Sequence, residues 1–416
     1  MTPETIFLII VVIVTANFLL GRYLDYINLK NQNPELPPEA DGIYDKDSYA
    51  KSQKYLKTKE NFAVIASVFS FFIILILLFF DGFAFIDGFI KNFSQNEIIL
   101  TLLFFGILGF GSDIIGIPFD IYFTFVIEKK FNFNKTTPKI YITDKIKMYL
   151  LSLIIGGGLI AVITWIYTIF TSWFWLIALI VITLFSVFMN MFYTQLIVPL
   201  FNKLTPLPDG ELRDAISNFA NKVKFSLKEI SVIDSSKRST KSNAYFSGLG
   251  KYKRIVLFDT LISKHSTEEL VAILAHEIAH FKKKHIIQGL LIGIVQTAFL
   301  LFLLSVFLKV PVFQYALNAS ETSFYFGILV FGLLYSPVSL VLHLLSNYIS
   351  RKNEFEADKF AGENYSAKVL AKSLKKLSSD NLSNLTPHPL YVFFNYSHPP
   401  LLERIKSLDK INSVLS

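Results

Sequence analysis

Cysteine is absent from all 416 residues. Disulfides and thiolate metal ligands are therefore excluded, so any bound metal must be held by His, Asp or Glu. Charge is also scarce, because Asp, Glu, Lys and Arg make up 17% of the chain, against about a quarter in an average soluble protein. No Lys or Arg precedes Arg22. Since a cleavable signal peptide needs a positive start, the first apolar run is expected to stay as a membrane span.

Hydrophobic residues are abundant instead, at 52% of the chain. Several apolar runs reach the length of roughly 20 helical residues that a hydrocarbon core requires. They cover residues 4–20, 62–80, 98–117, 147–170, 173–198, 286–308 and 323–347. We therefore expect a mostly α-helical, multi-pass membrane protein that has the lipid bilayer as a partner.

The basic residues that give the net charge of +8 are frequent in every second loop and rare in the loops between them. Lys and Arg number seven in the loop 21–61, one in the loop 81–97 and five in the loop 118–146. The hydrophilic segments 199–285 and 348–416 are basic as well. This alternation predicts an outside N-terminus and places the basic segments in the cytoplasm. Because the basic residues are spread over all inner loops, topology explains them better than nucleic-acid binding, and no nucleic acid partner is expected.

The sequence HEIAH, residues 276–280, precedes the sixth apolar run. Ser266 and Glu269 fit a capping box, which predicts a helix that begins near Thr267, and no Gly or Pro interrupts it before Gly289. Two histidines four residues apart share one helical face. They can bind one zinc ion, beside which the intervening glutamate acts as general base. It would take a proton from a water that zinc has made more acidic, and the hydroxide would attack a peptide carbonyl.

A third ligand is expected after the seventh run, where Glu354, Glu356 and Asp358 follow one another. Glu354 and Asp358 share a helical face, whereas Glu356 points elsewhere. One of the pair would bind the metal, and the other would orient a ligand histidine. Because the sixth run leaves the cytoplasm just after His280 and the seventh returns just before Glu354, both ligand sets meet at the cytoplasmic membrane face.

Residues 230–234 and 254–258 are predicted to be β-strands, with the segment NAYFSGL extended between them. An exposed strand edge could pair with a peptide substrate by β-augmentation. The alternatives to a site at HEIAH are a chance match to the motif and histidines that only extend toward the membrane interface. For Asn243 the alternative is an ordinary turn residue.

Taken together, these motifs resemble the integral-membrane CAAX prenyl protease 1 family of zinc endopeptidases, over nearly the whole chain. The resemblance is carried by TFVIEKKFNFN (124–134), PLFNKLTPLPDGEL (199–212), RSTKSNAYFSGLGKYKRIVLFDTLI (238–262), HEIAH (276–280), SRKNEFEAD (350–358) and YSHPPLLERI (396–405).

The resemblance implies a role for individual residues. It implies one Zn²⁺ per chain, held by His276, His280 and Glu354, with Glu277 as catalytic base. Asp358 falls where the family keeps an acid behind the ligands, and Asn243, with Ala244 and Tyr245, falls where the family binds the substrate backbone. His398 and Arg404 fall where the family places groups over the active site, and His398 could stabilise an oxyanion.

The implied fold is seven transmembrane helices in a barrel around an intramembrane chamber, capped on the cytoplasmic side by a zincin-like catalytic domain with a small β-element. We expect a membrane domain at 1–198, with inner loops 21–61 and 118–146. Spans six and seven, at 286–347, would complete the membrane part. The zinc protease domain would be divided between 199–285 and 348–416. His285 is assigned to the membrane interface, and His343 to packing or the chamber lining.

The expected function is hydrolysis of peptide bonds in peptides or membrane proteins, including prenylated C-termini. The bias toward Lys, Asn, Ile and Phe favours a bacterial member in the inner membrane, whereas a eukaryotic member would lie in the endoplasmic reticulum. The alternatives are a heat-shock-type membrane zinc protease, a seven-span metal transporter and a catalytically silent chaperone. A positioned Glu277 favours the enzyme, because metal transport needs ligands but no general base.

Overall fold

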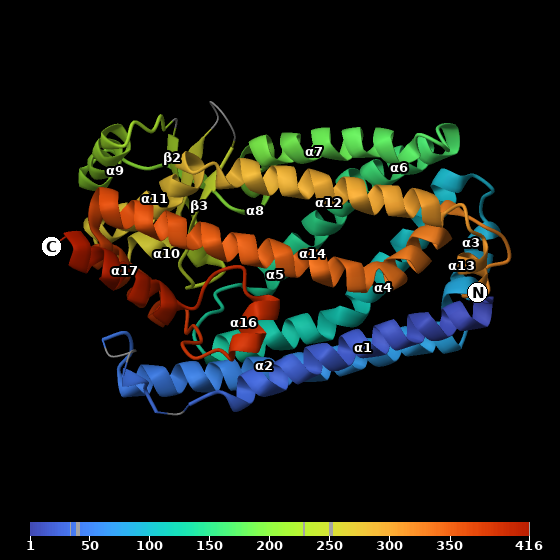
Figure 1. Cartoon of the computed structure of the whole chain (residues 1–416), viewed down its shortest axis with the longest axis horizontal. Helices are drawn as coiled ribbons and strands as arrows, with labels where there is room; N and C mark the ends of the chain where they lie inside the picture. The colour runs from blue at the N-terminus through green and yellow to red at the C-terminus, as the bar shows by residue number, and fades with distance from the viewer. Residues whose placement is uncertain (34, 39–41, 228, 249–252, 416) are drawn as a thin grey trace.

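The computed structural model describes residues 1–33, 35–38, 42–227, 229–248 and 253–415. Long helices run along the long axis of an elongated molecule, and the two hydrophilic segments gather at one end (Figure 1). The N-terminus lies at the opposite end from the C-terminus. The soluble part of the protein is therefore a cap on one end of the membrane part.

Seven helices of the described chain are long and apolar enough to cross a membrane, and each overlaps one predicted run. Several extend beyond the apolar run as continuous helix, so that they project out of the membrane. Their bounds are α1 (Pro3–Lys30), α2 (Lys46–Phe79), α4 (Glu97–Tyr122) continued by the π-helix η2 (Phe123–Glu128), α5 (Pro138–Leu151) continued by η3 (Ser152–Gly157) and α6 (Gly158–Ile169), α7 (Phe174–Leu196) continued by α8 (Val198–Phe201), α12 (His285–Phe307) and α14 (Phe324–Ala361).

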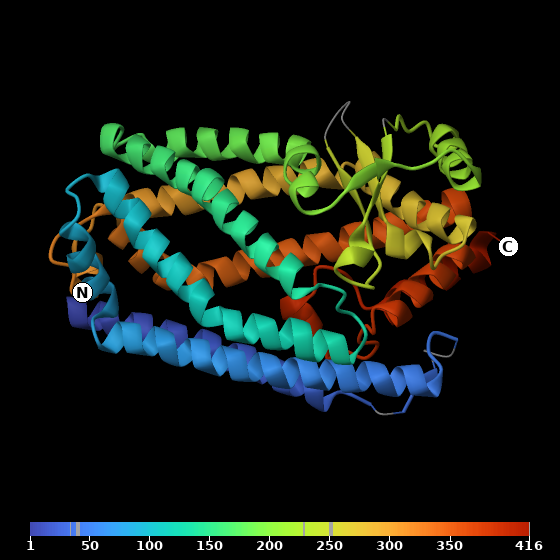
Figure 2. The same cartoon turned by 180° about the vertical axis from the view of Figure 1, so that it is seen from behind.

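These helices close into a ring. α1 packs on α2, and α2 packs on η2, the continuation of α4. The ring goes on from α4 through α6, α7 and α12, and α14 then packs on both α12 and α1. Figure 2 shows α4 and α5–α6 crossing obliquely between the α1–α2 pair and the α7–α12 pair. Two short helices, α3 (Gly82–Lys91) and α13 (Val312–Tyr315), lie at the end that holds the N-terminus.

Charged side chains cluster at the inner ends of the third and fourth spans, with Asp113 inside the run 98–117 and Asp120 and Lys145 just outside the runs. Asp113 of α4 lies 2.8 Å from Lys145 of α5, and Asp120 lies 3.1 Å from the same ammonium group. The side chain of Asp120 is 57% exposed. Because charged groups in membrane helices almost always face a bundle interior or a water-filled cavity, this cluster fits the expected chamber.

The soluble cap contains a four-stranded sheet of order β1-β2-β4-β3. Its strands are β1 (Leu204–Pro206), β2 (Glu229–Ile233), β3 (Ala244–Ser247) and β4 (Arg254–Phe258). β2 and β4 pair in parallel, whereas β1 and β3 are antiparallel to their neighbours. Both predicted strands are confirmed. Among the described residues β3 has no partner strand on its outer side.

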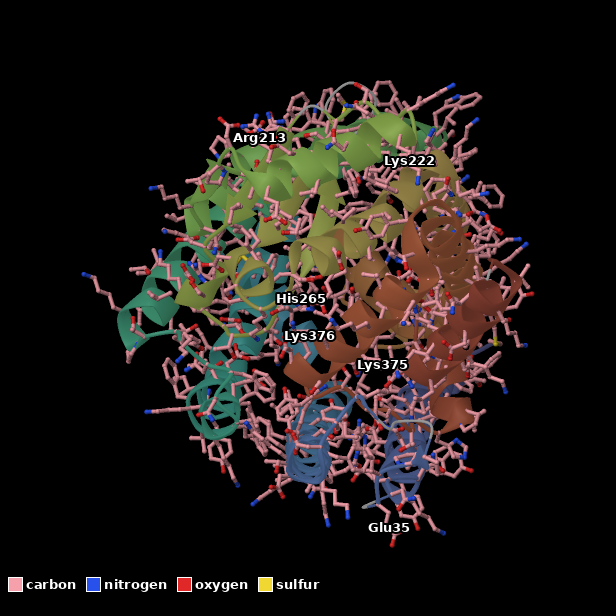
Figure 3. The ribbon with its side chains drawn as sticks, turned by 90° about the vertical axis from the view of Figure 1, so that its left-hand side faces the viewer. Glu35, Arg213, Lys222, His265, Lys375 and Lys376 are labelled. Atoms are coloured by element: carbon pink, nitrogen blue, oxygen red, sulfur yellow. The ribbon has the colours of Figure 1, made fainter. Side chains whose placement is uncertain are left out.

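Both hydrophilic segments build one core around helix α11 (Thr267–Lys282). Phe219 and Ile255 come from the first segment and Leu370 and Leu408 from the second. The cap is completed by α9 (Glu211–Lys222), the 3₁₀ turn η4 (Ser235–Lys237), α10 (Asp259–Ile262), η6 (Gly362–Ser366), α15 (Ala367–Asp380), α16 (Pro389–Asn395) and α17 (Leu401–Leu415). Figure 3 looks onto this end, where Arg213 and Lys222 of α9 and Lys375 and Lys376 of α15 are labelled.

The prediction of an unbroken helix from Thr267 to Gly289 was wrong. Helix α11 ends at Lys282, and Lys284 has a φ of 62°, in the left-handed region, before α12 begins at His285. The break lets α11 remain in the soluble core while α12 turns into the membrane ring.

Candidate metal centre

The two histidines of HEIAH lie on one face of α11. The Nε2 atoms of His276 and His280 are 3.2 Å apart. The helix begins as predicted, because the Ser266 hydroxyl accepts a hydrogen bond from the Glu269 N–H and the Glu269 carboxylate accepts one from the Ser266 N–H. This capping box fixes where the helix starts, and the 3.6-residue period then brings the two imidazoles together.

Glu354 of α14 completes the cluster. Its Oε2 atom lies 3.3 Å from Nε2 of His276, and its Oε1 atom lies 3.4 Å from Nε2 of His280. The side chain is buried, and no hydrogen bond reaches Oε2. Ligands bound to a tetrahedral ion at about 2.0–2.2 Å lie about 3.3–3.6 Å from one another. The three side chains therefore fit a single small cation.

Behind these groups lies a buried acid. Asp358 is fully buried, and its Oδ1 lies 2.8 Å from Nδ1 of His276. Arg404 of α17 donates to both Asp358 oxygens, through Nε at 2.8 Å and Nη2 at 2.7 Å. The structure thus places Glu354, and not Asp358, beside both Nε2 atoms, while Asp358 contacts the far side of the His276 ring.

The pKa values of three α11 side chains are set by their burial and by their charged neighbours. Burial raises the pKa of Glu277 to about 7, with the charge of Glu354 acting in the same direction. Burial alone lowers the pKa of His276, but hydrogen bonds to Asp358 and Glu354 reverse this and raise its pKa to about 9. Burial, with the neighbouring His276, lowers the pKa of His280 to about 4. A carboxyl with a pKa near neutrality is suited to general base catalysis.

A cavity of about 370 Å³ connects the cluster with five other predicted residues. Its lining includes Glu277, Asn243, Ala244, His398 and Arg404, together with the three clustered side chains. His398 is 64% exposed, and its Nε2 lies 3.4 Å from Oε1 of Glu354. Eight of the ten predicted site residues therefore line one cavity, although they come from four separate stretches of the chain.

The strand β3 borders this cavity. Asn243 precedes the strand and is exposed, whereas Ala244 is buried and pairs with Leu257. Tyr245 lies on the other side and lines an adjoining cavity of about 470 Å³, which also contacts Glu277 and His280. The strand β3 thus runs past the cluster of His276, His280 and Glu354.

Two residues make a contact near the site that the sequence did not predict. His285, assigned to the membrane interface, is buried at the start of α12, and its Nδ1 lies 3.1 Å from Nδ1 of His280. Glu356 is outside the cluster of His276, His280 and Glu354, as expected, and lies 3.4 Å from Nε2 of His285. Only the break at Lys284 brings these groups together, and no sequence signal marks that break. His343 hydrogen-bonds with Asn347 at 2.9 Å, which fits its predicted packing role.

Comparison with known proteins decides the family. The family model described as "CAAX prenyl protease N-terminal, five membrane helices" matches residues 25–203, and that of peptidase family M48 matches residues 206–412. The chain is 34% identical to CAAX prenyl protease 1 of Saccharomyces cerevisiae, over 95% of this chain and 94% of that protein. It is 35% identical to the Arabidopsis thaliana homolog, over 94% and 95%.

The chain belongs to the CAAX prenyl protease 1 family. A solved relative, described as the crystal structure of S. mikatae Ste24p, has a TM-score of 0.93 and 33% identity, over 97% of this chain and 99% of that one. Membership of the CAAX prenyl protease 1 family makes this a multi-pass integral membrane metalloendopeptidase. The predicted enzyme class and the predicted fold are confirmed.

Proposed function

We propose that this protein is a zinc endopeptidase in which His276, His280 and Glu354 hold one Zn²⁺ ion and Glu277 is the general base. The observation that carries the proposal is the cluster of these three side chains, called the ligand triangle below, on the wall of a cavity that Glu277 shares. The two Nε2 atoms lie 3.2 Å apart, and a different oxygen of Glu354 lies 3.3–3.4 Å from each of them. Two histidines and a glutamate are a donor set of catalytic zinc sites that leaves a coordination position open.

When bound, zinc supplies Lewis acidity, which makes water more acidic and polarises a carbonyl group. The protein side chains handle the proton. Glu277, whose pKa of about 7 allows it to accept and release a proton near neutrality, takes it from the attacking water and delivers it to the leaving amine. Asp358 and Arg404 hold the His276 ring, which keeps the ligand triangle in place before substrate arrives.

The substrate would bind as an added strand on the outer edge of β3. In this arrangement the backbone of Ala244 and Tyr245 pairs with the peptide, and the Asn243 side chain contacts the peptide beside the scissile bond. His398 stands across the cavity, near Glu354, and donates to the oxyanion that develops during attack. An Asn243→Ala variant is expected to cleave more slowly while its zinc content stays unchanged.

For the substrate class we infer peptides and membrane proteins, including prenylated C-termini, from the names of the relatives and from the membrane ring that adjoins the site. The basic soluble cap, built from 199–285 and 348–416, is placed at the cytoplasmic face by the positive-inside rule. The bacterial inner membrane is our inference for the host membrane, supported by the bias toward Lys, Asn, Ile and Phe.

The experiment is to measure the zinc content of the purified protein together with its cleavage of matched peptides, one farnesylated on a C-terminal CAAX sequence and one unmodified. One Zn²⁺ per chain and metal-dependent cleavage of either peptide are expected. Active protein without zinc would contradict the proposed site, and faster cleavage of the unmodified peptide would contradict prenyl recognition.

A further inference from the structure

The two ligand histidines differ in what lies behind their rings. His276 is backed by Asp358, as described above. His280 is backed by His285, the first residue of α12, with 3.1 Å between the two Nδ1 atoms. The His285 side chain is 6% exposed, and its Nε2 lies 3.4 Å from Oε2 of Glu356. Glu356, His285 and His280 therefore form a chain of polar contacts that ends at the ligand triangle.

The proton positions along this chain are mutually consistent. His280 directs Nε2 toward His276 and Glu354, so a metal would use the lone pair on that nitrogen. A neutral imidazole that offers Nε2 carries its hydrogen on Nδ1, and this N–H needs an acceptor. The nearest acceptor is Nδ1 of His285, which places the hydrogen of His285 on Nε2. That N–H faces the carboxylate of Glu356.

We propose that His285 is a positioning residue for His280. It accepts a hydrogen bond from the Nδ1–H of His280 and holds the ring with Nε2 toward the metal, and Glu356 fixes the tautomer of His285. Such outer partners set the orientation and basicity of ligating histidines. The inference rests on the proposed function, because the role requires a metal on His276, His280 and Glu354.

The helix break at Lys284 is what makes this contact possible. On a continuous helix, residues five apart are separated by about 140° around the axis, so His285 would face away from His280. The left-handed conformation is unfavourable for lysine, yet Lys284 adopts it, with a φ of 62°. The turn brings the first residue of α12 back onto the last ligand of α11. His285 is not itself a ligand, because it contacts the side of the His280 ring opposite to the triangle.

Two substitutions separate positioning from packing. His285→Phe keeps an aromatic ring but removes the acceptor, whereas His285→Asn loses most of the ring but keeps an acceptor near the place of Nδ1. We expect the Phe variant to bind Zn²⁺ about 10–100-fold more weakly in a chelator competition, and the Asn variant to stay close to the wild type. With Co²⁺ in the site, the visible absorption bands should shift in the Phe variant and not in the Asn variant.

Glu356→Gln should weaken Zn²⁺ binding less than His285→Phe, because the Glu356 carboxylate is 44% exposed and water can replace it. His343→Phe is the matched control, since this histidine lies on α14 and bonds to Asn347 away from the triangle. Its Zn²⁺ affinity should equal that of the wild type.

Wild-type Zn²⁺ affinity and an unchanged cobalt spectrum in His285→Phe would overturn the positioning role, as would equal losses in the Phe and Asn variants. Should the Phe variant not fold, a lost affinity in His285→Asn together with a wild-type cobalt spectrum in Glu356→Gln would overturn it. A wild-type protein that binds no Zn²⁺ would instead defeat the proposed function.

Discussion

Helices α11 and α14, which carry the proposed ligands, are built in opposite ways. α11 has 16 residues, and every residue from Glu269 to Ala279 except Glu277 is buried in the soluble core. α14 has 38 residues and runs unbroken from Phe324 in the membrane ring to Ala361 in the cap. The histidines are therefore positioned by the packing of a soluble domain, whereas Glu354 is positioned by a rod whose other half belongs to the membrane ring.

This difference means that a metal bound to all three side chains links the soluble core to the membrane ring. α14 contacts α1, α4 and α12 along the membrane part and α11, α15 and α17 in the cap. Any movement of the cap relative to the ring would pull Glu354 away from His276 and His280. The site is thus sensitive to both halves of the molecule, and substitutions in each half should affect it differently.

The largest effect is expected from Glu354→Ala, which removes the only ligand that α14 contributes to the proposed triangle. Zinc content should fall close to zero and cleavage should be lost. In the wild type, zinc at 100 times its dissociation constant should stabilise the fold by about 2.7 kcal/mol, and the variant should lose this thermal shift.

The matched control is Glu363→Ala, in η6 directly after α14. Its carboxylate is 46% exposed and lies 3.8 Å from Lys359. This variant should keep the zinc content, activity and thermal shift of the wild type. One tightly bound Zn²⁺ in Glu354→Ala would show that α14 is not needed to hold the metal.

The next effect is expected from Glu277→Gln on α11. The amide keeps the shape of the side chain but cannot accept the proton, so the cleavage rate should fall by about 10²–10⁴-fold. Zinc content should not change, because Glu277 is not part of the ligand triangle. Peptide hydrolysis with a fluorogenic substrate, measured beside zinc content, tests both expectations. Full activity in this variant would exclude Glu277 as the base.

Local sequence patterns were enough to predict much of this architecture. The membrane helices follow from the apolar runs, because the bilayer core offers the backbone no water to bond with. The N–H and C=O groups of such a run must therefore bond to one another within a helix. The proximity of His276 and His280 follows from their spacing on one helix. The spacing of Glu354 and Asp358 limited the third ligand to two residues, and the resemblance to the family then selected Glu354.

The contacts that local patterns could not predict join distant residues or depend on a backbone conformation. Arg404 reaches Asp358 from a helix 46 residues later in the chain, and only packing of α17 against α14 and α15 brings them together. The turn at Lys284 has no glycine to mark it, so the position of His285 behind His280 was not predicted. In both cases the missing information is tertiary.

A smaller effect is expected from two leucine-to-alanine substitutions, one in α11 and one in α14. Leu274 of α11 is 1% exposed, and Leu345 of α14 is 56% exposed on the membrane part. Leu274→Ala should destabilise the soluble cap by about 2–5 kcal/mol, because it leaves a cavity. Leu345→Ala should change the stability by less than about 0.5 kcal/mol. Thermal unfolding in detergent measures both, and equal losses would contradict the view that packing of the soluble core positions the histidines.

The smallest effect is expected at Lys284, between α11 and α12. A left-handed conformation costs a lysine about 1–2 kcal/mol, and Lys284→Gly should recover part of this while adding flexibility to the unfolded chain. We expect the apparent Tm to stay equal or rise by at most about 2–4 °C. Lys283→Gly is the control, because Lys283 has a φ of −84° and gains nothing from glycine. A lower Tm for Lys284→Gly than for Lys283→Gly would mean that the lysine side chain, and not the backbone turn, stabilises the junction between the cap and the ring.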